Sequence, residues 1–199
     1  MLKIGITGGI GAGKSYICKK LSVMGFPVFD CDANSKQIMN QDILVQDQLI
    51  QLLGKECYTE DGTLNRPYVA KLIFNNEQLK QDLENIVHPK VAQAFNQWAE
   101  AQNSPFVFVE SAILYESGFD AHVDKVIVVD ADMEVRIQRV MQRDLCTREQ
   151  AEQRIKAQMD SAEKQKRAHY IIYNNPTEEI NSQLFKLVKS LYSIAQQPK

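Results

Sequence analysis

The stretch GGIGAGKSY, residues 8–16, decides the fold, because its spacing from Gly8 to Ser15 matches the complete phosphate-binding loop pattern G-x-x-x-x-G-K-S. In such a loop the glycines let successive backbone N–H groups turn inward on an anion, at the N-terminus of the following helix. The lysine contacts the β- and γ-phosphates, and the hydroxyl ligates Mg²⁺. A glycine-rich turn with an accidental Lys-Ser pair is the alternative. The apolar run before the loop and the helical pattern after it favour a nucleoside triphosphate site, with Lys14 on the phosphates and Ser15 on the metal.

Five short apolar runs predict the strands of an α/β fold. Two of them, FVFVE and KVIVV, are almost continuously apolar, as expected of strands buried on both faces of a parallel sheet. A helix from about Lys14 to Met24, ended by Gly25, joins the first two strands into a βαβ unit. Thr177 is expected to start a terminal amphipathic helix with Ile180, Leu184, Leu187, Val188 and Leu191 on its core side. The five strands are predicted at residues 2–7, 27–30, 106–110, 125–129 and 170–173.

A long segment between the second and third strands carries no strand signal. Pro67 follows Asn65 and Arg66 at a position where a helix can start, and Pro89 is expected to mark a break. We predict a helical insertion that forms a subdomain for a second substrate. The apolar residues of this insertion that show helical spacing are Ile38, Leu44, Leu49, Leu52 and Leu53.

The segment after the fourth strand is rich in arginine. Asp132 can cap one helix, and TREQ, residues 147–150, is a capping-box pattern that opens another. The arginines form either a solvated face, salt-bridged to interleaved acids, or a lid that closes over the phosphates. A lid excludes water, and an arginine that stabilises the transferred charge raises the rate. The arginines concerned are Arg136, Arg139 and Arg143, spaced to share one helical face, and Arg148 and Arg154.

Acidic residues follow the strands that we expect beside the loop. Asp30 and Asp32 end the second strand, and in an extended segment residues i and i+2 face the same way, so both carboxylates are expected at one site. One can orient or deprotonate an acceptor hydroxyl, and the other can hold metal-bound water. Chemistry alone does not separate their roles, and helix-capping aspartates are the alternative. Glu110 ends the third strand and is either a partner of Mg²⁺ or a solvated strand end.

Composition excludes several classes of protein. The chain has 199 residues, 44% of them hydrophobic, with 23 basic and 25 acidic residues and a net charge of −2, so we expect no nucleic-acid partner. No apolar run approaches the roughly 18 residues of a membrane span, and the N-terminus opens into a strand rather than a signal peptide. We expect a cytoplasmic monomer. Its four cysteines, without a C-x-x-C pair, are expected to be free thiols rather than zinc ligands, namely Cys18, Cys31, Cys57 and Cys146.

Six segments together resemble one family of enzymes, the dephospho-coenzyme A kinases. In chain order they are TGGIGAGKS, VFDCDANSKQIM, DGTLNRPYVAKLIF, LENIVHPKV, MQRDLCTREQAEQRI and AHYIIYNN. The resemblance implies a phosphate-loop kinase core with a five-stranded parallel sheet at residues 1–32, 104–132 and 168–199. It also implies a helical acceptor subdomain at about 33–103 and an arginine-rich lid at about 133–167. The implied reaction transfers the γ-phosphoryl of ATP, with Mg²⁺, to the 3′-hydroxyl of dephospho-CoA, giving CoA and ADP.

The resemblance also implies roles for individual residues. Asp32 is the expected base, with Lys14 and Arg139 at the transferred phosphoryl. The acceptor is expected to meet Asp30, Asp32, Arg66, His88 and Arg154. Ser15, and more weakly Glu110, are expected at Mg²⁺. The nucleotide is expected to meet Gly8, Gly9, Gly11, Ala12, Gly13, Lys14, Ser15, Tyr16, Arg143, Arg148 and Asn174.

The chain departs from the family pattern at three places. VESAILYESG stands where the family has V-P-L-L-x-E, Tyr16 replaces a common threonine, and Asn175-Pro176 replaces Asn-Gly. Two other functions remain open from the residues alone. One is a different phosphate-loop kinase of small metabolites, acting on a nucleoside monophosphate or a sugar acid. The other is a non-catalytic nucleotide switch, although the chain has no N-K-x-D or D-x-x-G motif.

Overall fold

A computed structural model describes residues 1–74 and 76–196, so residue 75 and the end of the predicted core segment 168–199 lie outside the described residues. The chain divides into two compact units, each with its own core. The first unit comprises Met1–Asp30 and Ala101–Lys199, and the second comprises Cys31–Glu100.

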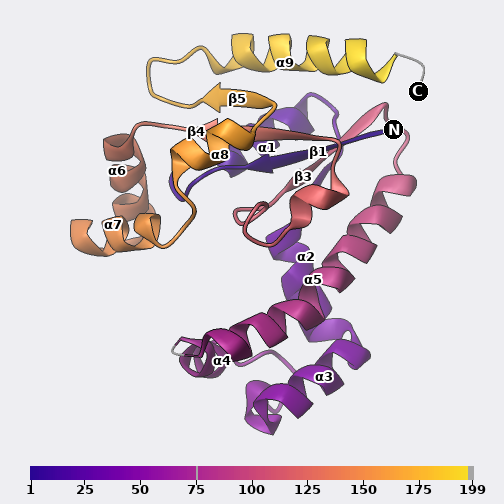
Figure 1. The fold of residues 1–199 in the computed structure, drawn as a ribbon, viewed down its shortest axis with the longest axis vertical. Coiled ribbons are helices and arrows are strands. Elements are labelled where there is room, and N and C mark those ends of the chain that lie inside the picture. The colour runs from indigo at the N-terminus through magenta and orange to yellow at the C-terminus, as the bar shows by residue number, and fades with distance from the viewer. Residues whose placement is uncertain (75, 197–199) are drawn as a thin grey trace. The chain divides into compact units, whose positions relative to one another are not determined.

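The first unit is built on a parallel sheet of five strands, which confirms the predicted fold class (Figure 1). The strand order is β2-β3-β1-β4-β5, so β1 lies in the middle with β3 and β4 on opposite sides. The phosphate loop therefore leaves the sheet at the carboxyl end of its central strand, where parallel sheets bind ligands. The strands are β1 (Leu2–Thr7), β2 (Val28–Asp30), β3 (Phe106–Glu110), β4 (Lys125–Asp130) and β5 (Tyr170–Tyr173).

Five helices and one 3₁₀ turn complete the first unit in the described residues. In Figure 1, α9 runs along β5, and α6 and α7 pack against each other. The capping box predicted at the start of α7 is confirmed, since Thr147 and Gln150 each bond the other's backbone N–H. The helices are α1 (Lys14–Val23), α6 (Met133–Asp144), α7 (Arg148–Lys156), α8 (Ser161–Arg167) and α9 (Ile180–Ala195), and the 3₁₀ turn is η2 (Phe119–His122).

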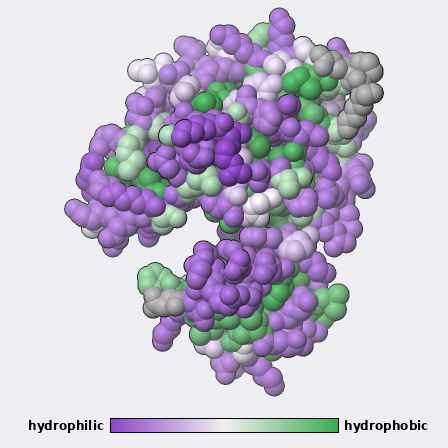
Figure 2. All heavy atoms as spheres, in the orientation of Figure 1, coloured by the Kyte–Doolittle hydropathy of each residue, from purple (hydrophilic) through white to green (hydrophobic). Residues whose placement is uncertain are grey.

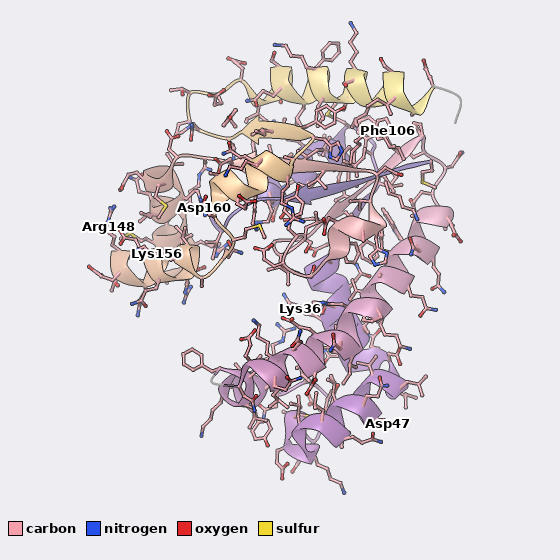
Figure 3. All side chains as sticks on the ribbon, viewed as in Figure 1. Lys36, Asp47, Phe106, Arg148, Lys156 and Asp160 are labelled. Carbon is pink, nitrogen blue, oxygen red and sulfur yellow. The ribbon has the colours of Figure 1, made fainter. Side chains whose placement is uncertain are left out.

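The two faces of the sheet pack against different elements. On one face, alternate strand residues form a buried cluster with α1 and α9. Phe106 of β3, labelled in Figure 3, lies in this cluster. Its ring centroid is 5.0 Å from the ring centroid of Phe26 and 5.0 Å from that of Tyr192 of α9. On the other face, α8 packs against β4, and a Cβ on Gly5 would lie 2.8 Å from Cδ1 of Leu114. The sheet is therefore covered on both sides, as its apolar strands predict.

The second unit is entirely helical apart from one isolated bridge between Tyr58 and Leu64, in the residues that the structure describes. Asp42 caps α3 by accepting from the N–H groups of Leu44 and Val45, at 3.0 and 3.2 Å, and these bonds, together with Lys90, hold its pKa below the usual value. The elements are α2 (Cys31–Gln41), α3 (Ile43–Leu53), η1 (Lys55–Cys57), α4 (Arg66–Ile73) and α5 (Glu77–Glu100). Their core contains Val45, Leu49, Leu53, Cys57, Leu64 and Val69.

Three sequence predictions about these elements are wrong. Pro89 does not break a helix but lies inside α5, because the buried face around Val87 and Phe95 outweighs the one backbone hydrogen bond that proline removes. The last helix does not start at Thr177, because a turn closed by the Glu178 N–H on the Asn175 carbonyl precedes it.

The third error concerns the acids. Asp30 is the last residue of β2, but Cys31 already begins α2, so Asp32 lies in the first turn of a helix. The alternation of an extended segment therefore does not apply to this pair. A carboxylate in the first turn of a helix is favoured by the partial positive charge of the helix N-terminus, which gives Asp32 a structural reason for its position.

Hydrophilic residues cover most of the surface in view in Figure 2. No helix among residues 1–74 and 76–196 combines the length and the apolar character needed to cross a lipid bilayer.

Candidate active site

The loop between β1 and α1 has the conformation that its glycines predict. Gly13 has a φ of 94°, and a Cβ at this position would lie 2.1 Å from Nδ2 of Asn174, so only glycine fits. Lys14 begins α1, and its ammonium donates to the carbonyl oxygen of Gly8 at 3.0 Å. The lysine therefore reaches back across the loop to its first residue.

Ser15 and Glu110 lie together at the carboxyl end of the sheet. The Ser15 hydroxyl donates to Oε1 of Glu110 at 2.9 Å. Glu110 is in register with Ile6 of β1 and with Asp30 of β2, so strand pairing brings both acids to one edge. A hydroxyl and carboxylates are oxygen ligands of the kind that Mg²⁺ prefers. The residues present therefore fit a magnesium ion beside the loop.

A buried thiol lies next to these groups. Cys18, one turn after Lys14 on α1, is 5% exposed, and burial followed by the charge of Glu110 raises its pKa well above the usual value. The thiol therefore stays protonated at neutral pH, which favours a packing role for Cys18 over that of a nucleophile.

Arg139 of α6 lies on the phosphate loop. Its Nη1 donates to the carbonyl oxygens of Gly11 and Ala12 at 3.3 and 3.4 Å, and its Nη2 donates to the Asn174 carbonyl at 2.8 Å. The side chain of Asn174 donates to the Ala12 carbonyl at 2.8 Å. Two segments far apart in the sequence, α6 and the residue after β5, thus converge on the loop. The two predicted site residues that they carry, Arg139 and Asn174, are held by each other and by the backbone of the loop.

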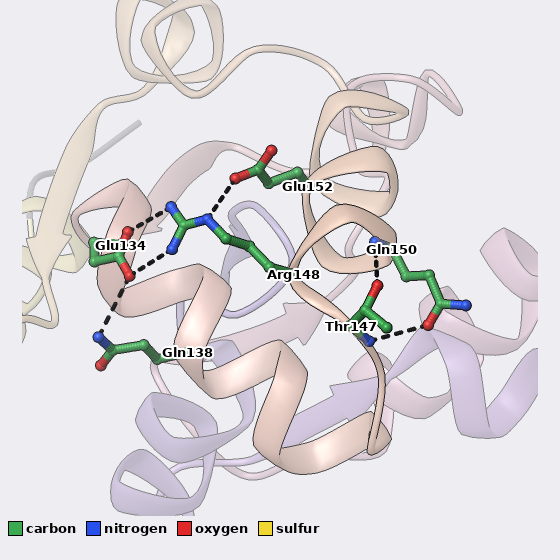
Figure 4. Close-up of polar contacts among 6 residues, drawn as sticks. All are labelled: Glu134, Gln138, Thr147, Arg148, Gln150 and Glu152. Carbon is green, nitrogen blue, oxygen red and sulfur yellow. Dashed lines mark hydrogen bonds and ion pairs between the residues drawn. The ribbon is translucent and has the colours of Figure 1, made fainter.

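The other lid arginines are bound to carboxylates of α6 and α7. Figure 4 shows Arg148 donating to both oxygens of Glu134, at 2.9 and 2.7 Å, and to Glu152 at 2.9 Å. The bonds from Arg148 lower the pKa of Glu134. Arg143 and Arg154 both pair with Asp144 at 2.7 Å. The structure therefore brings Arg139 to the loop, while these three arginines neutralise acids of α6 and α7.

A cavity of about 430 Å³ opens beside the loop. Its lining includes Tyr16, Arg139, Asn174, Pro176 and Glu178. Two predicted nucleotide residues, Tyr16 and Asn174, thus face one hollow, and the Tyr16 ring is 50% exposed. A hollow of this size, lined by both polar and apolar side chains and lying next to a phosphate loop, fits a nucleotide base.

The predicted acceptor residues of the second unit occupy two helices. Arg66 is exposed at the first position of α4, which Asn65 caps through a bond to the Tyr68 N–H at 3.3 Å. His88 is half-buried on α5, and burial lowers its pKa against the opposing charge of Glu84. The imidazole is therefore neutral at neutral pH and can donate one hydrogen bond and accept another.

Sequence reasoning grouped Arg136 with the lid arginines without placing it on the loop, and it missed Gln158. Arg136 is only 6% exposed and its Nε donates to the Ile10 carbonyl at 3.1 Å. Its spacing of three from Arg139 predicts that the two arginines share one helical face, and both contact the loop. Gln158 accepts from the Ile10 N–H at 2.7 Å, and no pattern in the sequence marks this glutamine.

Comparisons with known proteins agree on one family. A family model described as dephospho-CoA kinase matches residues 2–179. The dephospho-CoA kinase of Bacteroides fragilis strain YCH46 is 38% identical over 192 residues, covering 96% of this chain and 93% of the relative. The crystal structure of TT1252 from Thermus thermophilus superposes with a TM-score of 0.85 at 32% identity, covering 95% of this chain and 96% of that one. Dephospho-CoA kinase from Campylobacter jejuni has a TM-score of 0.70 at 27% identity, covering 96% and 97%.

Proposed function

The chain belongs to the dephospho-CoA kinase family, and we propose that the loop, acids and arginines described above transfer the γ-phosphoryl of ATP to the 3′-hydroxyl of dephospho-CoA. The chain is an ATP-dependent kinase of dephospho-CoA in coenzyme A synthesis. The single observation that carries the residue assignment is the convergence of Lys14, Ser15, Glu110 and Arg139 on one phosphate loop.

The phosphate loop holds the triphosphate of ATP in this proposal. The backbone N–H groups of residues 11–16 bind phosphate oxygens, and Lys14 contacts the β- and γ-phosphates. Ser15 and Glu110 would hold Mg²⁺, which when bound would neutralise charge on the phosphates. The base lies in the cavity lined by Tyr16 and Asn174.

Asp32 is the proposed base, because the family resemblance assigns it the acceptor hydroxyl. It takes the proton of the 3′-hydroxyl as the oxygen attacks the γ-phosphorus and the bond from that phosphorus to ADP breaks. Asp30 would hold metal-bound water. Arg66, His88 and Arg154 bind the acceptor, whose anionic groups suit guanidinium forks. We propose that residues 33–103 form the acceptor subdomain.

Arg139 stabilises the charge on the phosphoryl group during transfer. Residues 133–167 act as a lid, whose closure over the phosphates excludes water so that ATP is transferred rather than hydrolysed. In this proposal Arg143 and Arg148 leave the carboxylates that they bind in the structure and contact the nucleotide. The helices α6 and α7 share an apolar core, which holds the two parts of the lid together.

The ion pair between Glu134 and Arg148 predicts a measurable competition. Glu134→Gln removes the carboxylate that holds Arg148, so the KM for ATP is expected to fall by about two- to fivefold, the range that exposed ion pairs allow. Steady-state kinetics at low ionic strength measure this change in the KM for ATP. Glu149→Gln on α7 removes the same charge and is the matched control. An unchanged or higher KM in Glu134→Gln would exclude Arg148 from the nucleotide.

We further propose a monomer in the cytoplasm. The apolar side of α9, with Leu184 and Leu191, is buried within its own unit. All four cysteines are free, three of them buried, which suits a reducing compartment.

Acceptor-dependent ADP release tests the function. The protein is assayed with Mg²⁺-ATP alone and with dephospho-CoA, AMP, CMP, gluconate or shikimate. Stimulation by dephospho-CoA alone supports the proposal. Stimulation by another acceptor would favour a different metabolite kinase, and no stimulation would favour a nucleotide switch.

A further inference from the structure

Ile10, the third residue of the phosphate loop, contacts the segment from α6 to Gln158 through all of its groups. Its N–H donates to Oε1 of Gln158 at 2.7 Å, and its carbonyl accepts from Nε of Arg136 at 3.1 Å. Its side chain packs against the buried cluster shared by α6 and α7, which consists of Ile137, Val140, Ala151 and Ile155. We propose that Ile10 is a positioning residue that fixes the two ends of the lid segment to the phosphate loop. It holds the first end through Arg136 of α6 and the other end through Gln158.

The glycines on either side of Ile10 allow this close approach. A Cβ on Gly9 would lie 2.1 Å from Nη2 of Arg136, and one on Gly11 would lie 2.5 Å from the Arg136 carbonyl oxygen. Gly11 is therefore required by its φ of 80° and by the backbone of α6, and a side chain at position 9 would displace the Arg136 guanidinium. The loop and α6 are fitted to each other along three consecutive residues.

The residues that follow Gln158 in the chain are also held in place. The N–H of Met159 donates to Oε1 of Glu116 at 3.2 Å, and the same oxygen pairs with the ammonium of Lys164 at 2.8 Å. The Lys164 side chain is 0% exposed and donates to the Ala112 carbonyl at 3.0 Å. A buried ammonium that loses its partner is strongly unfavourable, so the ion pair with Lys164 fixes Glu116. Glu116 in turn holds the backbone of Met159, the residue after Gln158.

The contacts of Ile10 also affect catalysis, and this part of the inference rests on the proposed function. Arg139 lies one turn beyond Arg136 on α6, so its position over the loop depends on how the start of α6 is fixed to Ile10. A displacement of about 1 Å at a reacting group can lower a rate about 10²-fold. Ile10 is therefore expected to act on kcat more than on ATP binding.

Kinetics of three variants test the anchor. Ile10→Ala is expected to lower kcat by about tenfold or more, with the KM for ATP changed less than about threefold, and Ile10→Val is expected to recover most of the loss. Gln158→Met keeps the length of the side chain, removes the acceptor, and is expected to lower kcat in the same way. Leu187→Ala, a buried deletion on α9, is the control for a general loss of packing and is expected to keep kcat.

A second readout needs no acceptor and separates this inference from the proposed function. Amide hydrogen exchange at Ile10 is expected to be faster in Gln158→Met than in the wild type, because the N–H loses its partner. The anchor is excluded if exchange at Ile10 is unchanged. The anchor is also excluded if Ile10→Ala keeps the kcat of the wild type, or if its loss of kcat is no greater than that of Leu187→Ala. If the wild type fails to phosphorylate dephospho-CoA, the exchange result still decides on the anchor.

Discussion

Replacing Asp32 with asparagine is expected to lower kcat for phosphorylation of dephospho-CoA by roughly 10²–10⁴, while the KM for ATP changes little. Asparagine has the size of aspartate but cannot accept the proton of the acceptor hydroxyl. Asp32 lies in the first turn of α2, directly after β2, so the substitution leaves the strand and its pairing intact. Steady-state kinetics with both substrates varied measure the effect.

Two matched variants sharpen this test. Asp30→Asn, at the end of β2, is expected to lower activity less, because we assign Asp30 to metal-bound water. Asp47→Asn, on an exposed position of α3 labelled in Figure 3, controls for loss of one negative charge and is expected to be neutral. A larger loss in Asp30→Asn than in Asp32→Asn would move the base to Asp30. Equal losses of kcat and ATP affinity in Asp32→Asn would overturn the assignment of a base.

Replacing Arg139 with lysine is expected to lower kcat by about 10³, the lower end of what an arginine at a transferred phosphoryl group contributes. Lysine keeps the positive charge but loses the planar fork. In the structure that fork bonds the loop through one nitrogen and the Asn174 carbonyl through the other. An ammonium cannot reproduce this geometry, so its charge is misplaced relative to the phosphoryl group. Rapid-quench measurement of the first turnover isolates this step from product release.

Arg167→Lys is the matched control for Arg139→Lys. Arg167 pairs with Asp120 at 3.0 Å and lies over the Tyr115 ring, 4.1 Å from its centroid, so it too uses a planar guanidinium. We expect its replacement to leave the first turnover unchanged. A loss in Arg139→Lys no greater than in Arg167→Lys would remove Arg139 from the chemistry and leave it a structural support of the loop.

The sheet could be predicted from the sequence because each strand carries its own signal. Strands buried on both faces read as short apolar runs, and the loop pattern places the first strand and helix without reference to any other element. The capping box at Thr147 is equally local, because both partners lie within four residues. Features of this kind need no knowledge of the tertiary structure.

Other features could not be predicted because distant contacts decide them. Pro89 is tolerated in α5 because of the burial of one helix face, which local rules do not see. The partners of Arg143 and Arg148 depend on which acids the fold brings near them. The bond between Ile10 and Gln158 joins residues 148 apart in the sequence.

The most direct test of the central claim is to identify the product of the reaction. Protein, Mg²⁺-ATP and dephospho-CoA are incubated, and the products are followed by phosphorus NMR and mass spectrometry. We predict a new phosphomonoester on the ribose 3′-oxygen, formed in equal amount to ADP. Phosphate on another atom of dephospho-CoA, or inorganic phosphate with unchanged dephospho-CoA, would contradict the account.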